Sequence, residues 1–352
     1  MQRSGLAAAG REPLAGDAST RLYERLHLPG GGRLIFMDQP PRAETPPCPP
    51  EATPEDRARL GFNALYRLAA GRIEAFAACA GYLRDLGLSA PEVVAADPGQ
   101  GFAVLEDLGD DLFARVMAEG ADEAPLYDTA VDVLARLHQA QPPGVLCGYG
   151  LSWPLLTYDE LALKTAGDLF MDWQPQFNSR FVFGDRAKAE WEAVFAPVRA
   201  RGAALASVFC HRDFHAENLI WLPQRAGAAR CGLIDFQDAV RAHPAWDLSM
   251  LLHDARRDVS PAREEAVLGR YFDARGMVER EAFLADFHGL GALNVVRILG
   301  IFARLVVRDG KPRYAAFMPR LWRYLDRCAE APGPAGLAEW LARHAPPEAR
   351  AP

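Results

Sequence analysis

The sequence is poor in lysine and carries no excess of positive charge. Three of its 352 residues are lysines, and all other basic residues apart from histidine are arginines. The formal net charge at pH 7 is −7, whereas proteins that bind nucleic acid usually present a basic face. We therefore expect no nucleic-acid partner. The lysines are Lys164, Lys188 and Lys311.

The six cysteines are scattered, and no two of them have the C-x-x-C spacing of a zinc or redox site. Isolated cysteines in a chain of this size are typical of the reducing cytoplasm. We therefore expect free thiols, no structural zinc and a cytoplasmic location. The apolar run near the N-terminus is too short and too weak for a signal peptide.

No hydrophobic segment is both long and free of charge. The best candidate for a membrane span, residues 289–307, contains Asn294, Arg297 and Arg304. Charged side chains inside a span are costly, so this segment predicts a helix of a soluble protein and no membrane partner.

The first 109 residues have the pattern of a small sheet with one or two helices, preceded by a flexible N-terminus at residues 1–13. A proline-rich stretch, residues 40–54, predicts an irregular loop, and the sequence does not show whether this loop is a lid over a site. The expected strands are 19–28, 33–38, 93–96 and 102–106, and a helical segment covers 55–87 and ends at Gly87.

Helical periodicity dominates after residue 109. We therefore predict an α+β chain with two lobes, a small β-rich N-lobe at residues 14–109 and a larger, mainly helical C-lobe at residues 110–345. Clefts between lobes are common ligand sites. The expected helical segments are 111–119, 123–140, 155–172, 184–204 and 245–345, with one embedded hairpin at 206–236.

Three polar residues around the embedded hairpin carry the predicted chemistry. Asp213 lies in a loop after an apolar strand, Asn218 begins the next strand, and Asp235 ends the strand after that. Phosphoryl transfer needs one carboxylate for the acceptor hydroxyl, and a carboxamide with a second carboxylate for the magnesium bound to ATP. The spacing H-R-D-x-x-x-x-N followed by D-F is a kinase pattern, although single polar residues of this kind usually cap turns.

The segment after Asp235 is too short for a protein kinase. Twelve positions separate Asp235 from Asp247, and no A-P-E motif follows Asp235. A protein kinase needs room there for an activation loop and for docking a peptide. The pattern therefore favours a small-molecule acceptor.

The sequence resembles the aminoglycoside phosphotransferase and choline kinase superfamily at residues 211–218 (HRDFHAEN), 234–238 (IDFQD) and 243–248 (HPAWDL). Within it, the sequence is most similar to the bacterial anomeric kinases of cell-wall recycling, which act on N-acetylmuramate and N-acetylglucosamine. This second similarity also includes residues 15–21 (AGDASTR), 36–41 (FMDQPP), 105–110 (LEDLGD), 249–258 and 300–304 (GIFAR). The resemblance covers about residues 14–330 and implies a bilobal, protein-kinase-like fold.

The resemblance also implies roles for individual residues. Asp213 would be the catalytic base, and Asn218 and Asp235 would be the magnesium ligands. Asp247 would brace the catalytic loop, and His211 would be a packed structural residue. The residues that would bind nucleotide are Gly16, Asp17, Ala18 and Ser19 in a turn over the phosphates, and Glu106, Asp107 and Leu108 at the hinge against adenine.

The sequence departs from the usual kinase pattern in one respect. Kinases carry a lysine on an early strand that contacts the α- and β-phosphates, but no lysine precedes Lys164. The positive charge has to come from another residue, and Arg21 and Arg33 are the candidates. The absence also keeps open a pseudokinase that binds nucleotide without transferring phosphate.

Arginines at one face of a later helix suggest how the acceptor is recognised. Arg297, Arg304 and Arg308 lie within roughly 40° of one another on a helical projection. Guanidinium groups pair with carboxylates, and N-acetylmuramate has a lactyl carboxylate. Part of this row, or Arg256 and Arg257, is predicted to bind an anionic sugar. The alternative is that these arginines pair with nearby acidic residues or face water.

Three functions stay open at this point. The first is an ATP- and magnesium-dependent kinase that phosphorylates the anomeric hydroxyl of an amino sugar. The second is another small-molecule kinase of the same superfamily, with an aminoglycoside, choline, homoserine or thio-sugar acceptor. The third is the nucleotide-binding pseudokinase. The sequence does not indicate the oligomeric state.

Overall fold

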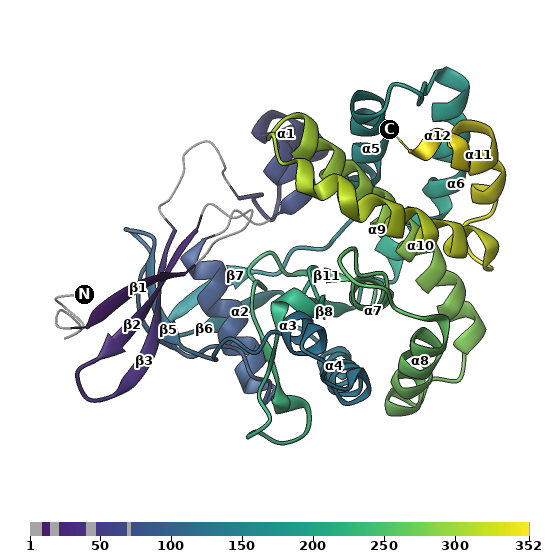
Figure 1. The fold of residues 1–352 in the computed structure, drawn as a ribbon. Helices are drawn as coiled ribbons and strands as arrows, with labels where there is room; N and C mark the ends of the chain where they lie inside the picture. Colours follow the sequence, from purple (N-terminus) through teal and green to yellow (C-terminus); the bar gives the residue numbers. More distant parts are fainter. Residues whose placement is uncertain (1–8, 15–20, 40–46, 69–71, 352) are drawn as a thin grey trace. The chain divides into compact units, whose positions relative to one another are not determined.

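The computed structural model describes residues 9–14, 21–39, 47–68 and 72–351 (Figure 1). By packing, the described chain divides into two compact units. The first contains the described residues up to Leu156 together with Ala216–Ala239, and the second contains Thr157–His215 and the chain from Val240 onwards. The predicted lobe boundary at residue 109 stays a prediction.

The first unit is built on a five-stranded antiparallel sheet. Apolar side chains from three neighbouring strands, Leu26, Phe36 and Val104, are buried together on the sheet. The strands are β1 (Gly10–Leu14), β2 (Leu22–Leu28), β3 (Gly32–Asp38), β4 (Val93–Asp97) and β5 (Phe102–Glu106), in the order β1-β2-β3-β5-β4.

Strand β1 corrects the predicted flexible N-terminus. Gly10–Leu14 pairs with β2 over its whole length, from Gly10 opposite His27 to Leu14 opposite Tyr23. The prediction was wrong for these residues because β1 is an exposed edge strand without an alternating apolar pattern. Backbone pairing and an ion pair between Arg11 and Glu24 hold it in place, and neither leaves a signal in the local sequence.

Helices and two small hairpins complete the first unit. The predicted helical segment at 55–87 is interrupted into three pieces, and Gly87 has φ of +70° just after the last of them, as a C-terminal cap requires. Residues 47–53 of the proline-rich segment contain no helix or strand, and residues 40–46 lie outside the described residues. The helical elements are α1 (Pro54–Leu60), η2 (Asn63–Arg67), α2 (Ile73–Asp85), α3 (Phe113–Ala118), α4 (Glu123–Gln139), η3 (Ala216–Asn218) and η4 (Gly227–Arg230).

The hairpin of β6 (Val145–Gly148) and β7 (Leu151–Pro154) was not predicted from the sequence. Its turn residues Tyr149 and Gly150 both have positive φ, at 54° and 75°. The hairpin packs on α2 through two glycines, because a Cβ atom on Gly81 would lie 2.6 Å from the Cα atom of Gly148. The hairpin was missed because its strands have only four residues and few large apolar side chains, so no alternating pattern is visible in the sequence.

The second unit is mainly helical and surrounds one long helix, α9 (Arg280–Val307). Helices α5 and α10 pack along α9 (Figure 1). Helix α9 is long and apolar enough to cross a membrane, but 72% of its apolar window is buried inside the protein, as in the core helix of a soluble protein. The remaining helices are α5 (Glu160–Phe177), α6 (Asp185–Ala204), α7 (Ala245–Leu252), α8 (Pro261–Arg275), η5 (Pro312–Phe317), α10 (Met318–Glu330), α11 (Leu337–His344) and α12 (Pro347–Arg350).

The single hairpin predicted at 206–236 is two separate strand pairs. Strand β9 (Leu219–Trp221) pairs with β10 (Cys231–Leu233) in the first unit. Strand β8 (Val208–Cys210) pairs instead with β11 (Val240–Ala242) in the second unit. The prediction of one hairpin was wrong because each strand has only three residues, which is too short for a periodic pattern to show its partner.

Candidate active site

The residues just before Asp213 are fixed to helix α7 by Asp247. The buried carboxylate of Asp247 accepts hydrogen bonds from the N–H groups of His211 (2.6 Å) and Arg212 (2.8 Å) and from the thiol of Cys210 (3.1 Å). Burial raises the pKa of Asp247, and these donors together with the nearby His211 oppose that effect. This is the contact that a bracing role requires, although the role in catalysis stays a prediction.

Arg212 has a strained backbone at the same place. Its φ is 78°, a region that residues other than glycine rarely adopt and that often marks functional sites. Its guanidinium is buried over the ring of Tyr158, 4.9 Å from the ring centre. The packed side chain and the two N–H bonds to Asp247 therefore hold the turn that presents Asp213.

Asp213 lies beside Arg297 of α9. The Nη2 atom of Arg297 is 3.8 Å from the Oδ1 atom of Asp213, and the side chains are 5% and 36% exposed. The Nε atom of Arg297 donates to the side chain of Asn294 (2.8 Å), and its guanidinium lies 5.6 Å from the ring centre of Trp246. The second unit thus combines a partly exposed carboxylate with a fixed positive charge.

Asn218 and Asp235 lie next to each other in the first unit. Asn218 ends η3, Asp235 follows β10, and the N–H of Ile234 donates to the carbonyl of Asn218 at 3.1 Å. Asp235 also has a positive φ of 65°, so it is a second strained residue. Its side chain is 40% exposed, and a carboxylate with a neighbouring carboxamide is a donor set that suits magnesium.

No larger cluster of metal-binding side chains competes with this pair. Within the described ranges, no group of three or more histidine, cysteine, aspartate or glutamate side chains could hold a metal ion. A magnesium ion at Asn218 and Asp235 would therefore take its other oxygen ligands from the nucleotide phosphates and water, as magnesium usually does.

Asp235 already has a positively charged neighbour. Nη2 of Arg21 lies 2.7 Å from Oδ1 of Asp235, and Nε2 of Gln237 donates to the same oxygen at 2.9 Å. Arg21 immediately precedes β2, and its side chain is 7% exposed. Of the two arginines that could replace the missing lysine, Arg21 is thus the one with an ion pair to a predicted metal ligand.

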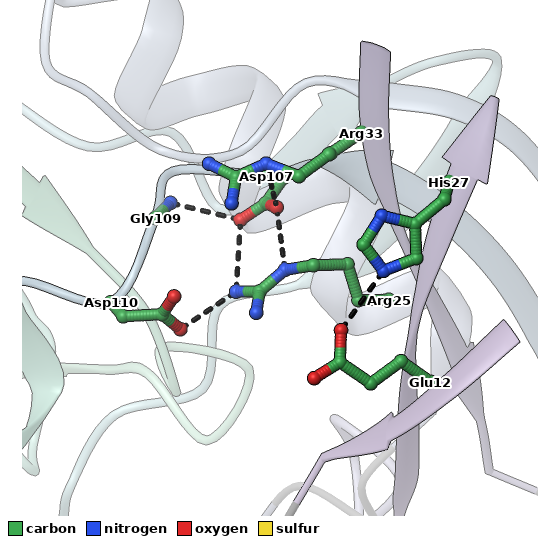
Figure 2. Close-up of polar contacts among 7 residues, drawn as sticks. All are labelled: Glu12, Arg25, His27, Arg33, Asp107, Gly109 and Asp110. Atoms are coloured by element: carbon green, nitrogen blue, oxygen red, sulfur yellow. Dashed lines mark hydrogen bonds and ion pairs between the residues drawn. The ribbon is translucent and has the colours of Figure 1, made fainter. Parts of the chain in front are cut away.

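The predicted hinge is held by a group of charged side chains (Figure 2). The carboxylate of Asp107 is 3% exposed and contacts Arg25 (2.8 Å), Arg33 (3.4 Å) and the N–H of Gly109 (2.9 Å). Burial alone would raise the pKa of Asp107, but the hydrogen bonds from Arg25 and Gly109 lower it below its ordinary value. Arg25 also reaches Asp110 at 2.6 Å, so it ties β2 to the segment after β5.

The other two hinge residues are also engaged through their side chains. Glu106 pairs with Arg225 (2.6 Å) and Arg84 (3.3 Å), and Leu108 is buried against Ile220 and Leu222. The backbone N–H of Glu106 donates to the carbonyl of Glu92 at 2.8 Å, and the contact of residues 106–108 with adenine stays a prediction.

Comparison with known proteins decides the family. Residues 10–285 match the Phosphotransferase enzyme family. The chain belongs to this family. It is 64% identical over 350 residues to the N-acetylmuramate/N-acetylglucosamine kinase of Caulobacter vibrioides, a match that covers 99% of this chain and 96% of the relative. A kinase of the same name from Pseudomonas aeruginosa is 31% identical, with coverage of 94% and 87%.

Solved structures agree on the fold. An aminoglycoside 2′-phosphotransferase-IIIa mutant in complex with GDP has a TM-score of 0.55 and 14% sequence identity, and the match covers 91% of both chains. This likeness shows the fold alone. The predicted α+β, protein-kinase-like class and the predicted small-molecule kinase activity are confirmed for this phosphotransferase.

Gly16, Asp17, Ala18 and Ser19 lie outside the described residues. His211 is buried and packs edge-on against Phe214, with ring centres 5.6 Å apart. Within the arginine row, Arg297 is buried near Asp213, Arg304 is half-buried, and Arg308 is exposed and pairs with Asp309 at 2.6 Å.

Arg256 was also predicted to bind the acceptor. Its N–H donates to the side chain of Asp254 at 2.8 Å, and its guanidinium lies 5.9 Å from the ring centre of Phe317. Arg297 is thus the predicted acceptor residue with a recorded ion pair to Asp213.

The sequence did not single out Arg25, Gln237 or Asn294. Each contacts a partner whose position depends on the fold. Arg25, for example, contacts Asp107, which lies 82 residues later in the chain. The available signals were weak: an arginine in the middle of a strand for Arg25, and a polar residue in an apolar helix segment for Asn294.

Proposed function

We propose that this phosphotransferase uses ATP and magnesium to phosphorylate the anomeric hydroxyl of N-acetylmuramate, N-acetylglucosamine or both, in the cytoplasmic recycling of cell-wall sugars. The main support for this proposal is the 64% identity with a kinase named for these two sugars, over nearly the whole of both chains. The ion pair of Arg297 with Asp213 supports an anionic acceptor.

Asp213 is the proposed catalytic base. It would accept the proton of the anomeric hydroxyl as the new oxygen–phosphorus bond forms, while the bond to the ADP oxygen breaks. Asp213 is partly exposed and is held by a turn that Asp247 fixes, so its carboxylate is both reachable and oriented. Orientation of this kind supplies much of the rate enhancement in phosphoryl transfer.

Asn218 and Asp235 are the proposed magnesium ligands. Bound magnesium would neutralise charge on the transferred phosphoryl group. Asn218 and Asp235 would offer two oxygen ligands from segments joined by the hydrogen bond between Ile234 and Asn218. Arg21 and Gln237 contact the carboxylate of Asp235 and fix its direction.

Arg297 is the proposed contact for the acceptor. It lies beside the proposed base, and hydrogen bonding to Asn294 restricts its side chain. A guanidinium suits the lactyl carboxylate of N-acetylmuramate and disfavours cationic acceptors such as kanamycin or choline.

The function is tested with purified protein, ATP, magnesium and a panel of acceptors: N-acetylmuramate, N-acetylglucosamine, glucose, kanamycin, choline and homoserine. Release of ADP is followed for the wild type and for Asp213→Asn. We expect turnover on the amino sugars and none in the variant. Turnover on a cationic acceptor alone would contradict the proposed substrate, and ATP binding without turnover on any acceptor would favour a pseudokinase.

A further inference from the structure

Arg21 is a buried cation with a partly exposed anionic partner. Its side chain is 7% exposed, whereas that of Asp235 is 40% exposed. Besides Asp235, the guanidinium donates to the hydroxyl of Tyr23 at 3.1 Å. A buried guanidinium is costly unless it is paired and hydrogen-bonded, so the position of Arg21 depends on anionic partners.

The first unit has no lysine that could take this position. All three lysines of the sequence, Lys164, Lys188 and Lys311, belong to the second unit. A kinase of this fold usually has a lysine near the nucleotide phosphates. In this chain, a permanently charged side chain beside Asp235 within the first unit must therefore be an arginine.

The structure distinguishes the two arginines that could take this position. Arg33 is 53% exposed and contacts Asp107, the hinge residue, at 3.4 Å. Arg21 contacts Asp235, the proposed magnesium ligand, at 2.7 Å. Nucleotide phosphates are held close to the magnesium ion, so the residue beside the magnesium ligand is the one placed to meet them.

We propose that Arg21 supplies the positive charge for the nucleotide phosphates that other kinases take from a lysine, and that it also positions the carboxylate of Asp235. This inference rests on the proposed kinase function. A guanidinium has several donors in a planar fork, so it can hold a carboxylate and a phosphate oxygen together, whereas an ammonium group is a compact point charge. The missing lysine then no longer favours a pseudokinase.

Binding without turnover tests this role. Affinities for ADP and for adenosine are measured by calorimetry, in EDTA and then with magnesium, for the wild type, Arg21→Gln and Arg21→Lys. Adenosine has no phosphate, so the ratio of the two affinities isolates the phosphate contact. The matched control is Arg11→Gln, which removes an exposed ion pair with Glu24 in the same sheet.

We expect Arg21→Gln to bind ADP about 10- to 100-fold more weakly in EDTA, the range for a charge-assisted hydrogen bond, with unchanged adenosine affinity. Arg21→Lys should be intermediate, and Arg11→Gln should match the wild type. Equal loss for both ligands, or loss for neither, would overturn the proposal and leave Arg21 with a structural role. If Arg21→Gln does not fold, Arg21→Lys provides the test. A ratio of ADP affinity to adenosine affinity equal to that of the wild type would then overturn the proposal.

The same experiment separates this inference from the proposed function. Wild-type protein that binds no nucleotide would overturn both. Wild-type protein that binds ADP and phosphorylates an amino sugar, together with an Arg21→Gln variant of equal ADP affinity, would overturn the role of Arg21 alone.

Discussion

The N–H of Arg212 donates a 2.8 Å hydrogen bond to the carboxylate of Asp247, while the backbone of Arg212 has a φ of 78°. A residue other than glycine holds this conformation only when its surroundings stabilise it. Here the buried carboxylate and the stacking of the Arg212 side chain on Tyr158 do so. The orientation of Asp213, the next residue, therefore depends on a side chain 34 positions later, Asp247.

Replacing Asp247 with asparagine should reduce turnover more than it reduces acceptor binding. The amide can accept through one oxygen only, so one of the N–H groups of His211 and Arg212 loses its acceptor. We expect kcat to fall by at least about tenfold with a smaller change in KM, and the free energy of unfolding to fall by about 2 kcal/mol. Steady-state kinetics and urea unfolding measure the two effects.

Ser249→Ala is the matched control for Asp247→Asn. Ser249 is also buried on α7, and its hydroxyl donates to the carbonyl of Trp246 at 2.8 Å. We expect a loss of about 1 kcal/mol in stability and an unchanged kcat. A comparable fall of kcat in both variants would mean that Asp247 acts through general stability.

The arginines of α9 should differ in their effect on acceptor choice. If Arg297 binds the lactyl carboxylate, Arg297→Gln should lower kcat/KM for N-acetylmuramate by about 10- to 100-fold more than for N-acetylglucosamine. Arg304→Ala should give a smaller change of the same sign, and Arg308→Ala, whose arginine pairs with Asp309, should give none. Equal losses for the two sugars in every variant would contradict the proposed carboxylate contact.

The sequence selects the candidate residues that follow from fixed spacing, and their roles in catalysis stay predictions. Asp213, Asn218 and Asp235 could be selected because phosphoryl transfer needs those residue types in that order. The ion pair between Arg21 and Asp235 could not be predicted, because 214 positions separate the two residues and only the fold brings them together. The sequence offered Arg21 and Arg33 as equal candidates, and only the contacts distinguish them.

The fold was predicted where apolar periodicity is strong and missed where it is weak. Helix α4 begins at Glu123 and ends at Gln139, close to the predicted 123–140. Strand β1, with an exposed pattern, and the three-residue strands β8 and β11 were missed or wrongly paired. Backbone pairing stabilises such short strands, and pairing leaves no periodic signal in one strand alone.

Gly300 should not tolerate a side chain. It lies in α9 against the backbone of α5, where an added Cβ would be 2.4 Å from the carbonyl carbon of Leu169. We expect Gly300→Ala to lower the free energy of unfolding by about 1–3 kcal/mol, because the two helices must move apart. Thermal unfolding of the purified variant measures this.

Gly269→Ala is the matched control for Gly300→Ala. Gly269 lies inside α8, and apart from the nearby backbone of that helix and its chain neighbours, no atom is within 4 Å of the position that its Cβ would take. Alanine is favoured over glycine in a helix, so this variant should gain about 0.5–1 kcal/mol. Destabilisation of similar size at both positions would contradict the close contact of α9 with α5.

Acid should weaken a cluster of charges around Glu190 on α6. Hydrogen bonds from His344 and Arg186, with a further contribution from Arg343, lower the pKa of Glu190 to about 2. Because the folded protein holds this carboxylate ionised, its contribution to stability is present above its ordinary pKa, about 4.5, and is lost as the pH falls towards 2. Glu190→Gln should therefore be less stable than the wild type at pH 6, and the difference should disappear near pH 2.

Urea unfolding of both proteins between pH 6 and pH 2 measures this effect. The exposed Glu339 on α11 provides the control, since Glu339→Gln should change stability little at any pH. A difference between the wild type and Glu190→Gln that stays constant down to pH 2 would contradict the lowered pKa of Glu190.

The position of the transferred phosphate tests the central proposal most directly. A phosphate on the anomeric oxygen removes the reducing end of an amino sugar, whereas a phosphate on any other hydroxyl leaves it intact. Reducing sugar and ADP should be measured together in a reaction with N-acetylglucosamine, ATP and magnesium, with Asp213→Asn as the control. The account predicts that one reducing end disappears for each ADP formed and that neither changes in the variant. ADP release with an intact reducing end, or equal turnover by Asp213→Asn, would contradict it.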